Sequence, residues 1–404
     1  MAGFGRLALL GTARGAASAF GLLAVLLIAR ALSPEQLGHW SLALAVQGYA
    51  LHLGEFGLRS VVTTEAARAG RRLPELLARY LRLRLAMTAL ALALVTVGCA
   101  VWRPSDLPLV ALVTLSIVPI ALQLDWLALV DGRIWLASGL LLARPIAFLL
   151  FVALWPGTLD PGRVAVCFLA AWLIAAMLSW AALGRAATDL PGMLPMGALM
   201  MRRGACLAGV TVGNQLQLSA DLLVVGWVLG SAAAGDYWLA GQILVAGLLF
   251  ANAAGQTALA RLPALTHRPE RFGRTLLAET RHALIVALLG VAVAIPTAPI
   301  LLPLLFSAEH VGAAPVLLWL LPWFLLQHPT TVLQAGLTAV GRAKMVLRAN
   351  LLAAVALLPA LAVAAAAESL TAFALARAAA ETVRLAVLLL ALAPALAPQT
   401  SMTA

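Results

Sequence analysis

The chain has 404 residues, of which 63% are hydrophobic and only 11% are charged, and its mean hydropathy is +1.00. A soluble domain of ordinary composition is about 25% charged, so these values exclude a soluble protein and predict an integral membrane protein. The 27 basic and 16 acidic residues leave a formal charge of +11. Cys99, Cys167 and Cys206 lie in apolar runs without paired spacing, so we expect no disulfide framework, no metal and no cofactor.

Apolar segments in the chain are continuous and rich in Leu and Ala, which excludes the short alternating strands of a membrane barrel. Crossing a hydrocarbon core takes roughly 20 apolar residues, so spans and connections of roughly 33 residues each predict about twelve helices. The first run resembles a signal peptide, but its length predicts that it stays as a helix. The expected spans are 7–32, 38–58, 83–101, 107–130, 134–155, 164–183, 205–230, 237–259, 283–304, 313–337, 346–366 and 370–392.

The basic residues are strongly segregated between the connections. Twenty of the 27 fall in connections on the side of the N-terminus, three fall on the other side, and four lie within proposed spans. Because cytoplasmic loops carry the excess of Lys and Arg, both termini are predicted to be cytoplasmic and the outer loops short.

The longest connection, 183–204, contains two prolines and divides the chain into a first lobe, 1–196, and a second lobe, 197–404, of six helices each. An offset of 197 residues places Gly38 on Gly235 and Leu42 on Leu239. A repeat of six spans preserves orientation, so the sequence predicts an all-α membrane protein of about twelve transmembrane helices in two six-helix lobes. The lobes are related by a pseudo-two-fold axis along the membrane normal, with a binding site between them.

Several segments, in this order along the chain, resemble the polysaccharide transporter family. This family comprises the Wzx-like oligosaccharide flippases of the multidrug/oligosaccharidyl-lipid/polysaccharide superfamily. The resemblance covers most of the chain and rests on the segments ARALSPEQLGHWSLA at 29–43, EFGLR at 55–59, DWL at 125–127, DGR at 131–133, SADLLVVG at 219–226, GDYWLA at 235–240 and LTAVGRAK at 337–344.

The resemblance implies a transporter that flips an undecaprenyl-diphosphate-linked oligosaccharide, such as an O-antigen or exopolysaccharide repeat unit. Transport would run across the bacterial inner membrane by alternating access of the two lobes. It also implies membrane lipids and a polysaccharide polymerase as partners, and no nucleic acid.

Arginines inside or at the ends of the spans are the candidate anion ligands, because a charge at the bilayer centre costs about 3 kcal/mol or more. Arg144 lies about ten residues into the fifth span, too deep for easy snorkelling, which favours a lumen site. Arg14 either lines a cavity or snorkels to the cytoplasm. Arg59, with Glu55 one turn earlier as a possible partner, either binds substrate or anchors the span. Guanidinium groups suit a diphosphate because they bind phosphate oxygens bidentately.

Two helices carry polar stripes. Thr211, Asn214, Gln217 and Asp221 share one face of the seventh helix and form either a helix–helix seam or, as we favour, a lumen wall. Side chains at helical spacing in the tenth helix form either a sugar-contacting surface or packing; they are Trp319, Trp323, Gln327, Thr330 and Gln334. In the last helix, Arg377, Glu381 and Arg384 are expected to neutralise one another as a structural feature.

An enzyme is not expected, because the proposed outer connections have roughly ten residues or fewer and leave no room for a separate catalytic site. The closer alternative is an ion-coupled multidrug exporter of the same superfamily, with Asp221 or Glu381 as the coupling carboxylate. A lumen with several arginines argues against a cationic drug. A multispanning polysaccharide-assembly enzyme is the weaker alternative.

Overall fold

The computed structural model describes residues 2–69, 73–184, 198–248, 251–252, 254–255, 258, 262–265, 268–306 and 308–396. The regular elements among these residues are helices, and they fall into two compact units, Met1–Gln215 and Leu216–Ala404. The division lies within a helix, beyond the 196/197 boundary expected from the long connection. Each unit is therefore described by itself.

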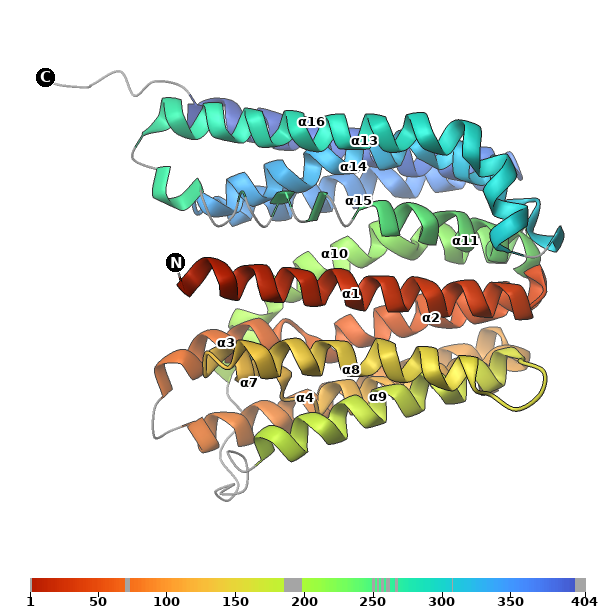
Figure 1. Ribbon diagram of the computed structural model, residues 1–404, viewed down its shortest axis with the longest axis horizontal. Helices are drawn as coiled ribbons and strands as arrows, with labels where there is room; N and C mark the ends of the chain where they lie inside the picture. Colours follow the sequence, from red (N-terminus) through yellow and green to blue (C-terminus); the bar gives the residue numbers. More distant parts are fainter. Residues whose placement is uncertain are drawn as a thin grey trace, which may run out of the picture. The chain divides into compact units, whose positions relative to one another are not determined.

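The first unit contains most of the shorter helices. In chain order they are α1 (Ala2–Ala31), α2 (Pro34–Glu55), α3 (Leu58–Ala69), α4 (Leu73–Trp102), η2 (Pro104–Asp106), α5 (Leu107–Leu115), α6 (Ile117–Ala121), α7 (Asp125–Val130), α8 (Ile134–Ala153), α9 (Pro161–Leu183) and the first part of α10 (Ala198–Val228). Helix α1 lies along α8, and α8 packs on α9 (Figure 1).

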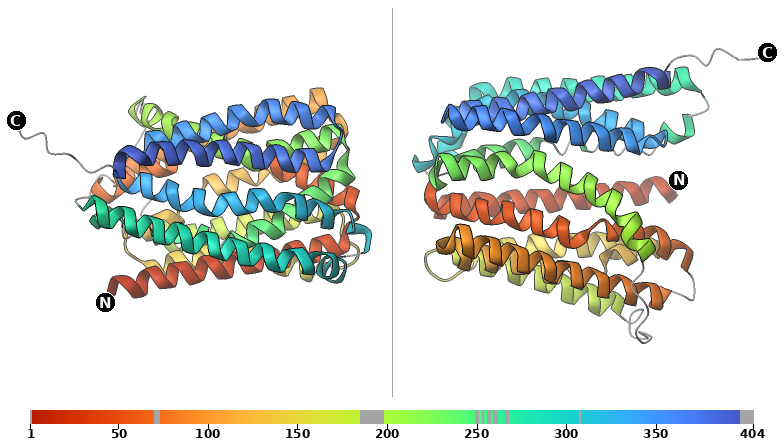
Figure 2. Two further views of the ribbon diagram at one scale, coloured as in Figure 1. Left: turned by 90° about the horizontal axis from the view of Figure 1, so that it is seen from above. Right: turned by 180° about the vertical axis from the view of Figure 1, so that it is seen from behind.

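The second unit contains the end of α10 and the longest single helix, α13 (Pro269–Leu305). In chain order its helices after α10 are α11 (Ser231–Gly247), η4 (Leu262–Leu265), α13, η5 (Ala308–His310), α14 (Ala313–Ala339), α15 (Ala343–Ala366) and α16 (Leu370–Leu396). Helices α15 and α16 run side by side over most of their length (Figure 2), and α14 packs against both α13 and α16.

The fourth expected span, 107–130, is not one continuous helix. It is broken into α5, α6 and α7, and the break between α6 and α7 exposes backbone groups that α9 satisfies. The Trp180 indole donates to the Leu122 carbonyl at 2.7 Å, and the Ser179 hydroxyl accepts from the Leu124 amide at 3.3 Å. Backbone irregularity at membrane depth is stable only where such partners exist, and here it places Asp125 at the start of α7.

Eight segments of the described chain are long and apolar enough to cross a membrane. They are Leu9–Ala31, Leu73–Trp102, Pro104–Val130, Ile134–Ala153, Pro161–Leu183, Glu270–Ile300, Ala313–Ala339 and Ala343–Ala366. Helices α2 and α10 are long but more polar, α16 is long and carries three charged residues, and part of the expected span 237–259 lies outside the described residues. The total of twelve spans stays a prediction.

Apolar side chains lie on both the inner and the outer surfaces of the helices. Leu and Val side chains such as Leu94, Val97 and Leu289 are more than half exposed, as expected of a surface that contacts lipid. Each unit also has a buried apolar cluster, one around Leu77, Tyr80 and Trp126 in the first unit and one around Phe272, Leu276 and Val332 in the second.

Candidate substrate site

The polar stripe of α10 continues into the core of the second unit. Asp221 is completely buried there, and its carboxylate accepts hydrogen bonds from the Tyr237 hydroxyl of α11 at 2.7 Å and from Arg377 Nη1 of α16 at 3.0 Å. The guanidinium of Arg377 also lies over the Trp323 ring of α14, 3.9 Å from its centroid. An acid, a base, a phenol and an indole from four helices therefore form one buried group.

A second buried group surrounds Arg384, two turns further along α16. Its guanidinium donates to Glu381 at 2.8 and 3.1 Å, to Gln217 Oε1 at 2.9 Å and to Gln327 Oε1 at 2.5 Å. Gln217 Nε2 in turn donates to the Asn350 carbonyl of α15 at 2.7 Å. The stripes of α10 and α14 thus meet through Arg384.

These contacts neutralise the acidic residues of α10 and α16 within the second unit. Asp221 pairs with Arg377, and Glu381 pairs with Arg384, and all four side chains are at least nine-tenths buried. The expected pairing within the last helix holds for Glu381 and Arg384, whereas Arg377 pairs with Asp221 instead. Burial favours the seam interpretation for Gln217 and Asp221, because their polar atoms are already engaged by neighbouring helices, and it favours packing for Trp323, whose ring lies against the Arg377 guanidinium.

In the first unit, Arg59 of α3 pairs with Asp125 of α7 at 2.7 Å. The suggested partner, Glu55, is not the one that forms this bond, because Phe56 (φ 45°) and Gly57 (φ 66°) interrupt the helix between positions 55 and 59. Two residues four apart meet on one helical face only if the helix is continuous. Although burial opposes the charged form, the Asp125 carboxylate holds the pKa of Arg59 above its ordinary value.

The chain is tightly packed at this interruption. A Cβ on Gly57 would lie 2.6 Å from the Gly204 carbonyl oxygen, and a Cβ on Gly204 would lie 2.5 Å from the Phe56 carbonyl oxygen. Only glycine fits both positions, and its tolerance of positive φ is also needed at Gly57. This contact fixes the direction in which α3 leaves α2, and so the position of Arg59.

Arg144 has no acidic partner among the described residues. Its guanidinium lies over the Trp172 ring of α9, 4.8 Å from the centroid, and forms no hydrogen bond within that part of the chain. Arg14 of α1 is exposed and is likewise without an ion pair among the residues described. Helices α1 and α8, which carry these two arginines, pack side by side.

The remaining expected site residues are partly accessible. Asn214 lies in α10 on the first-unit side of the division and is half-buried, and Gln327 is half-buried while bonded to Arg384. Spacing and composition predicted no role for Tyr237, Asn350 or Trp172. Tyr237 lies within the GDYWLA segment, which was the one available signal for it.

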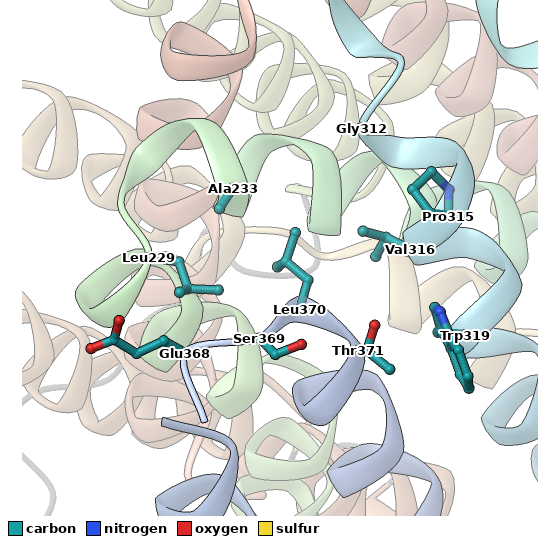
Figure 3. Close-up of a pocket in the computed structure, with 10 residues that line it drawn as sticks. All are labelled: Leu229, Ala233, Gly312, Pro315, Val316, Trp319, Glu368, Ser369, Leu370 and Thr371. Carbon is teal, nitrogen blue, oxygen red and sulfur yellow. The ribbon is translucent and has the colours of Figure 1, made fainter. Parts of the chain in front are cut away.

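One end of the second unit is hollowed by a pocket of about 520 Å³. Three turns form it: the one between α10 and α11, the one before α14, and the one between α15 and α16 (Figure 3). By the charge asymmetry of the connections, this end is predicted to face outward.

A histidine and an aspartate pair at the corresponding end of each unit. In the second unit His310 of η5 lies 3.5 Å from Asp236 of α11, and in the first unit His39 of α2 lies 3.4 Å from Asp106 of η2. Each pair joins the start of a helix to the short 3-10 turn that follows another long helix. The two units therefore share a contact as well as a helix order.

The fold and these buried groups define a polytopic, all-α membrane protein. No protein-family model matches the sequence, and no curated protein matches it. Solved structures do match. An inward-facing multidrug resistance MATE family transporter of the MOP superfamily, the superfamily named above, has a TM-score of 0.76 at 13% identity, over 95% of this chain and 96% of that one.

Two further structures show the same likeness. The lipid II flippase MurJ in an inward closed conformation has a TM-score of 0.72 at 13% identity, over 95% of this chain and 87% of that chain. An outward-facing MATE family transporter has a TM-score of 0.64 at 14% identity, over 94% of each chain. The chain is a multi-pass integral membrane protein with the fold of MOP-superfamily transporters, and the matched proteins are transporters and a flippase rather than enzymes.

Proposed function

We propose that the chain flips a polyprenyl-diphosphate-linked oligosaccharide, an O-antigen or exopolysaccharide repeat unit, across the bacterial inner membrane by alternating access. The observation that carries this proposal is the guanidinium of Arg144 within an apolar helix, which has no acidic partner among the residues that the structure describes. An isolated charge at that depth costs about 3 kcal/mol or more, and a diphosphate would offset this cost by accepting its hydrogen bonds.

Three arginines of the first unit have distinct parts in this proposal. Arg144 and Arg14 lack acidic partners among the described residues and are free to bind phosphate oxygens, at about 1.5–3 kcal/mol for each charge-assisted bond. Arg59 is paired with the Asp125 carboxylate, so it binds the diphosphate more weakly than an unpaired arginine would and releases it more readily. Asn214 of the first unit and Gln327 of the second supply amides for the glycan, while Gln217, Asp221 and Trp323 stabilise the second unit.

An ion-coupled multidrug exporter is the second candidate, and the structural likeness to MATE transporters favours it. Its expected coupling carboxylates are Asp221 and Glu381, and each is paired with an arginine. A cation would have to displace a guanidinium from a buried site to bind there, which costs several kcal/mol. Charge pairing in the second unit therefore supports the flippase proposal over the exporter.

The flippase proposal is tested with the purified chain in liposomes. The probe is a short-chain polyprenyl diphosphate carrying a fluorescent hexosamine, and a membrane-impermeant reductant measures how much of it reaches the outer leaflet. Arg144→Gln should fold and insert but flip at least about tenfold more slowly, which corresponds to about 1.4 kcal/mol. Arg144→Lys should retain part of the activity because it keeps the charge but loses the bidentate geometry.

Arg133→Gln is the matched control, since Arg133 is exposed at the start of the same helix. It should flip the probe at the wild-type rate. Undiminished flipping by Arg144→Gln would exclude Arg144 as the anion ligand. Export of a cationic dye, together with no movement of the lipid probe by the wild-type chain, would establish the exporter instead.

A further inference from the structure

The outward-predicted pocket of the second unit combines an aromatic face with a short polar edge. Trp319 of α14 is 47% exposed and forms one side. Glu368 and Ser369 of the α15–α16 turn and Thr371 at the start of α16 contribute the carboxylate and hydroxyl groups. In Figure 3, Glu368 and Trp319 stand at opposite ends, with Ser369 and Thr371 between them. The other walls are apolar, among them Leu229 and Val316.

Trp319 and Trp323 lie one turn apart on α14 but are in different environments. Trp323 is buried, and the Arg377 guanidinium covers its ring at 3.9 Å. Trp319 has no such cover and presents its ring to the pocket. Of the two tryptophans in the stripe, only Trp319 is available to a ligand.

We propose that this pocket binds a sugar ring of the transported oligosaccharide as the glycan leaves the protein, an inference that rests on the proposed flippase function. The Trp319 ring would stack on the apolar C–H face of the sugar, as aromatic side chains pack on apolar surfaces while leaving polar edges free. Ser369 and Thr371 exchange hydrogen bonds with sugar hydroxyls, and Glu368 accepts one from the far edge. The volume of about 520 Å³ lies within the usual range of small-molecule sites, about 300–1,000 Å³.

A lipid acyl chain is the competing occupant, and the polar edge argues against it. An acyl chain has no group to pair with the hydroxyls of Ser369 and Thr371 or with the Glu368 carboxylate, and polar groups covered without partners are destabilising. Glu368 also adopts a left-handed backbone conformation, with φ at 47°, which is unfavourable for a residue other than glycine. The turn therefore holds Glu368 at the pocket rim in a backbone conformation that this residue type does not favour.

The test measures binding of the glycan alone to the full chain. The probe is the oligosaccharide released by mild acid from the polyprenyl-diphosphate pool of the strain that encodes the chain, and saturation-transfer NMR reports its contact with the protein. Trp319→Leu should weaken binding at least about fivefold, and Trp319→Phe and Thr371→Val should each retain a part of it. Trp102→Leu is the control, because Trp102 is 87% exposed in the first unit.

A second arm tests the acyl chain. Phospholipids with brominated tails quench the fluorescence of tryptophans that they touch, and the difference between wild type and Trp319→Phe isolates Trp319. Glycan binding that depends on Trp319, with little quenching, supports the proposal. The proposal is overturned if the wild-type chain does not bind the glycan, or if brominated lipids strongly quench Trp319. It is also overturned if folded Trp319→Phe and Trp319→Leu variants bind the glycan as well as wild type does.

The outcomes separate this inference from the flippase proposal. If the chain flips the lipid-linked probe but does not bind the released glycan, the pocket assignment fails and the function stands. If it binds the glycan through Trp319 but moves no lipid-linked probe, the pocket remains a sugar site and the flippase function fails.

Discussion

Breaking the Asp221–Arg377 pair should destabilise the second unit by about 2–3 kcal/mol. Removing one partner of a buried ion pair costs about 3–5 kcal/mol, because the other charge stays buried without compensation. Two effects reduce the cost here. The Trp323 ring, 3.9 Å from the Arg377 guanidinium, still supplies a cation–π contact of about 2 kcal/mol, and a chain unfolded within a membrane also finds polar partners.

Asp221→Asn is the perturbation, and reversible unfolding in mixed micelles with increasing sodium dodecyl sulfate is the assay. The double variant Asp221→Asn with Arg377→Gln removes the uncompensated charge, so it should be at least about 1.5 kcal/mol more stable than the sum of the single effects predicts. Glu270→Gln, which breaks an exposed pair with Arg274 at 3.7 Å, should change stability by no more than about 0.5 kcal/mol. Additive single effects, or a loss below about 1 kcal/mol for Asp221→Asn, would refute this account of the buried group.

Two further predictions concern packing and topology. Gly57→Ala should destabilise the first unit by about 2 kcal/mol or more because its Cβ meets the Gly204 carbonyl at 2.6 Å and its φ is positive, whereas Gly98→Ala, with open space around it in α4, should be neutral or slightly stabilising in the same unfolding assay. In a cysteine-free background, an impermeant thiol reagent added to intact spheroplasts should label a cysteine at Gly157 and not one at Arg271; the reverse pattern would contradict the orientation with cytoplasmic termini.

Residues spaced three and four apart were the most informative part of the sequence. That spacing placed Gln217 and Asp221 on one face of α10 and Gln327 on a face of α14, and both faces do contribute to a buried polar group. The periodicity shows which side chains share a face, because helix geometry is local. Whether that face meets another helix or an open lumen depends on the neighbouring helices, which spacing alone does not specify.

Long-range partners were the least predictable part. Asp125 is 66 positions from Arg59, and Arg377 is 156 positions from Asp221, so no local rule connects them. The pairing of helical residues four apart predicted Glu55 as the partner of Arg59. It does not apply because Phe56 and Gly57 both have positive φ, and of these two residues only a glycine indicates such a conformation in the sequence. Similarly, the backbone groups at the break between α6 and α7 bond to Ser179 and Trp180 from another helix. The run 107–130 offers Pro119, Gln123 and Asp125 as local signs of an interruption, but nothing in it names those partners.

The histidine–aspartate pairs at the outward-predicted ends of the two units have exchanged residues between corresponding positions. The 197-residue offset sets His39 opposite Asp236, so the helix of one unit carries the base where the helix of the other carries the acid. A column-by-column comparison of the halves scores this position as a mismatch, although the physical contact is the same. If the halves arose by duplication, the contact outlasted the residues that first made it.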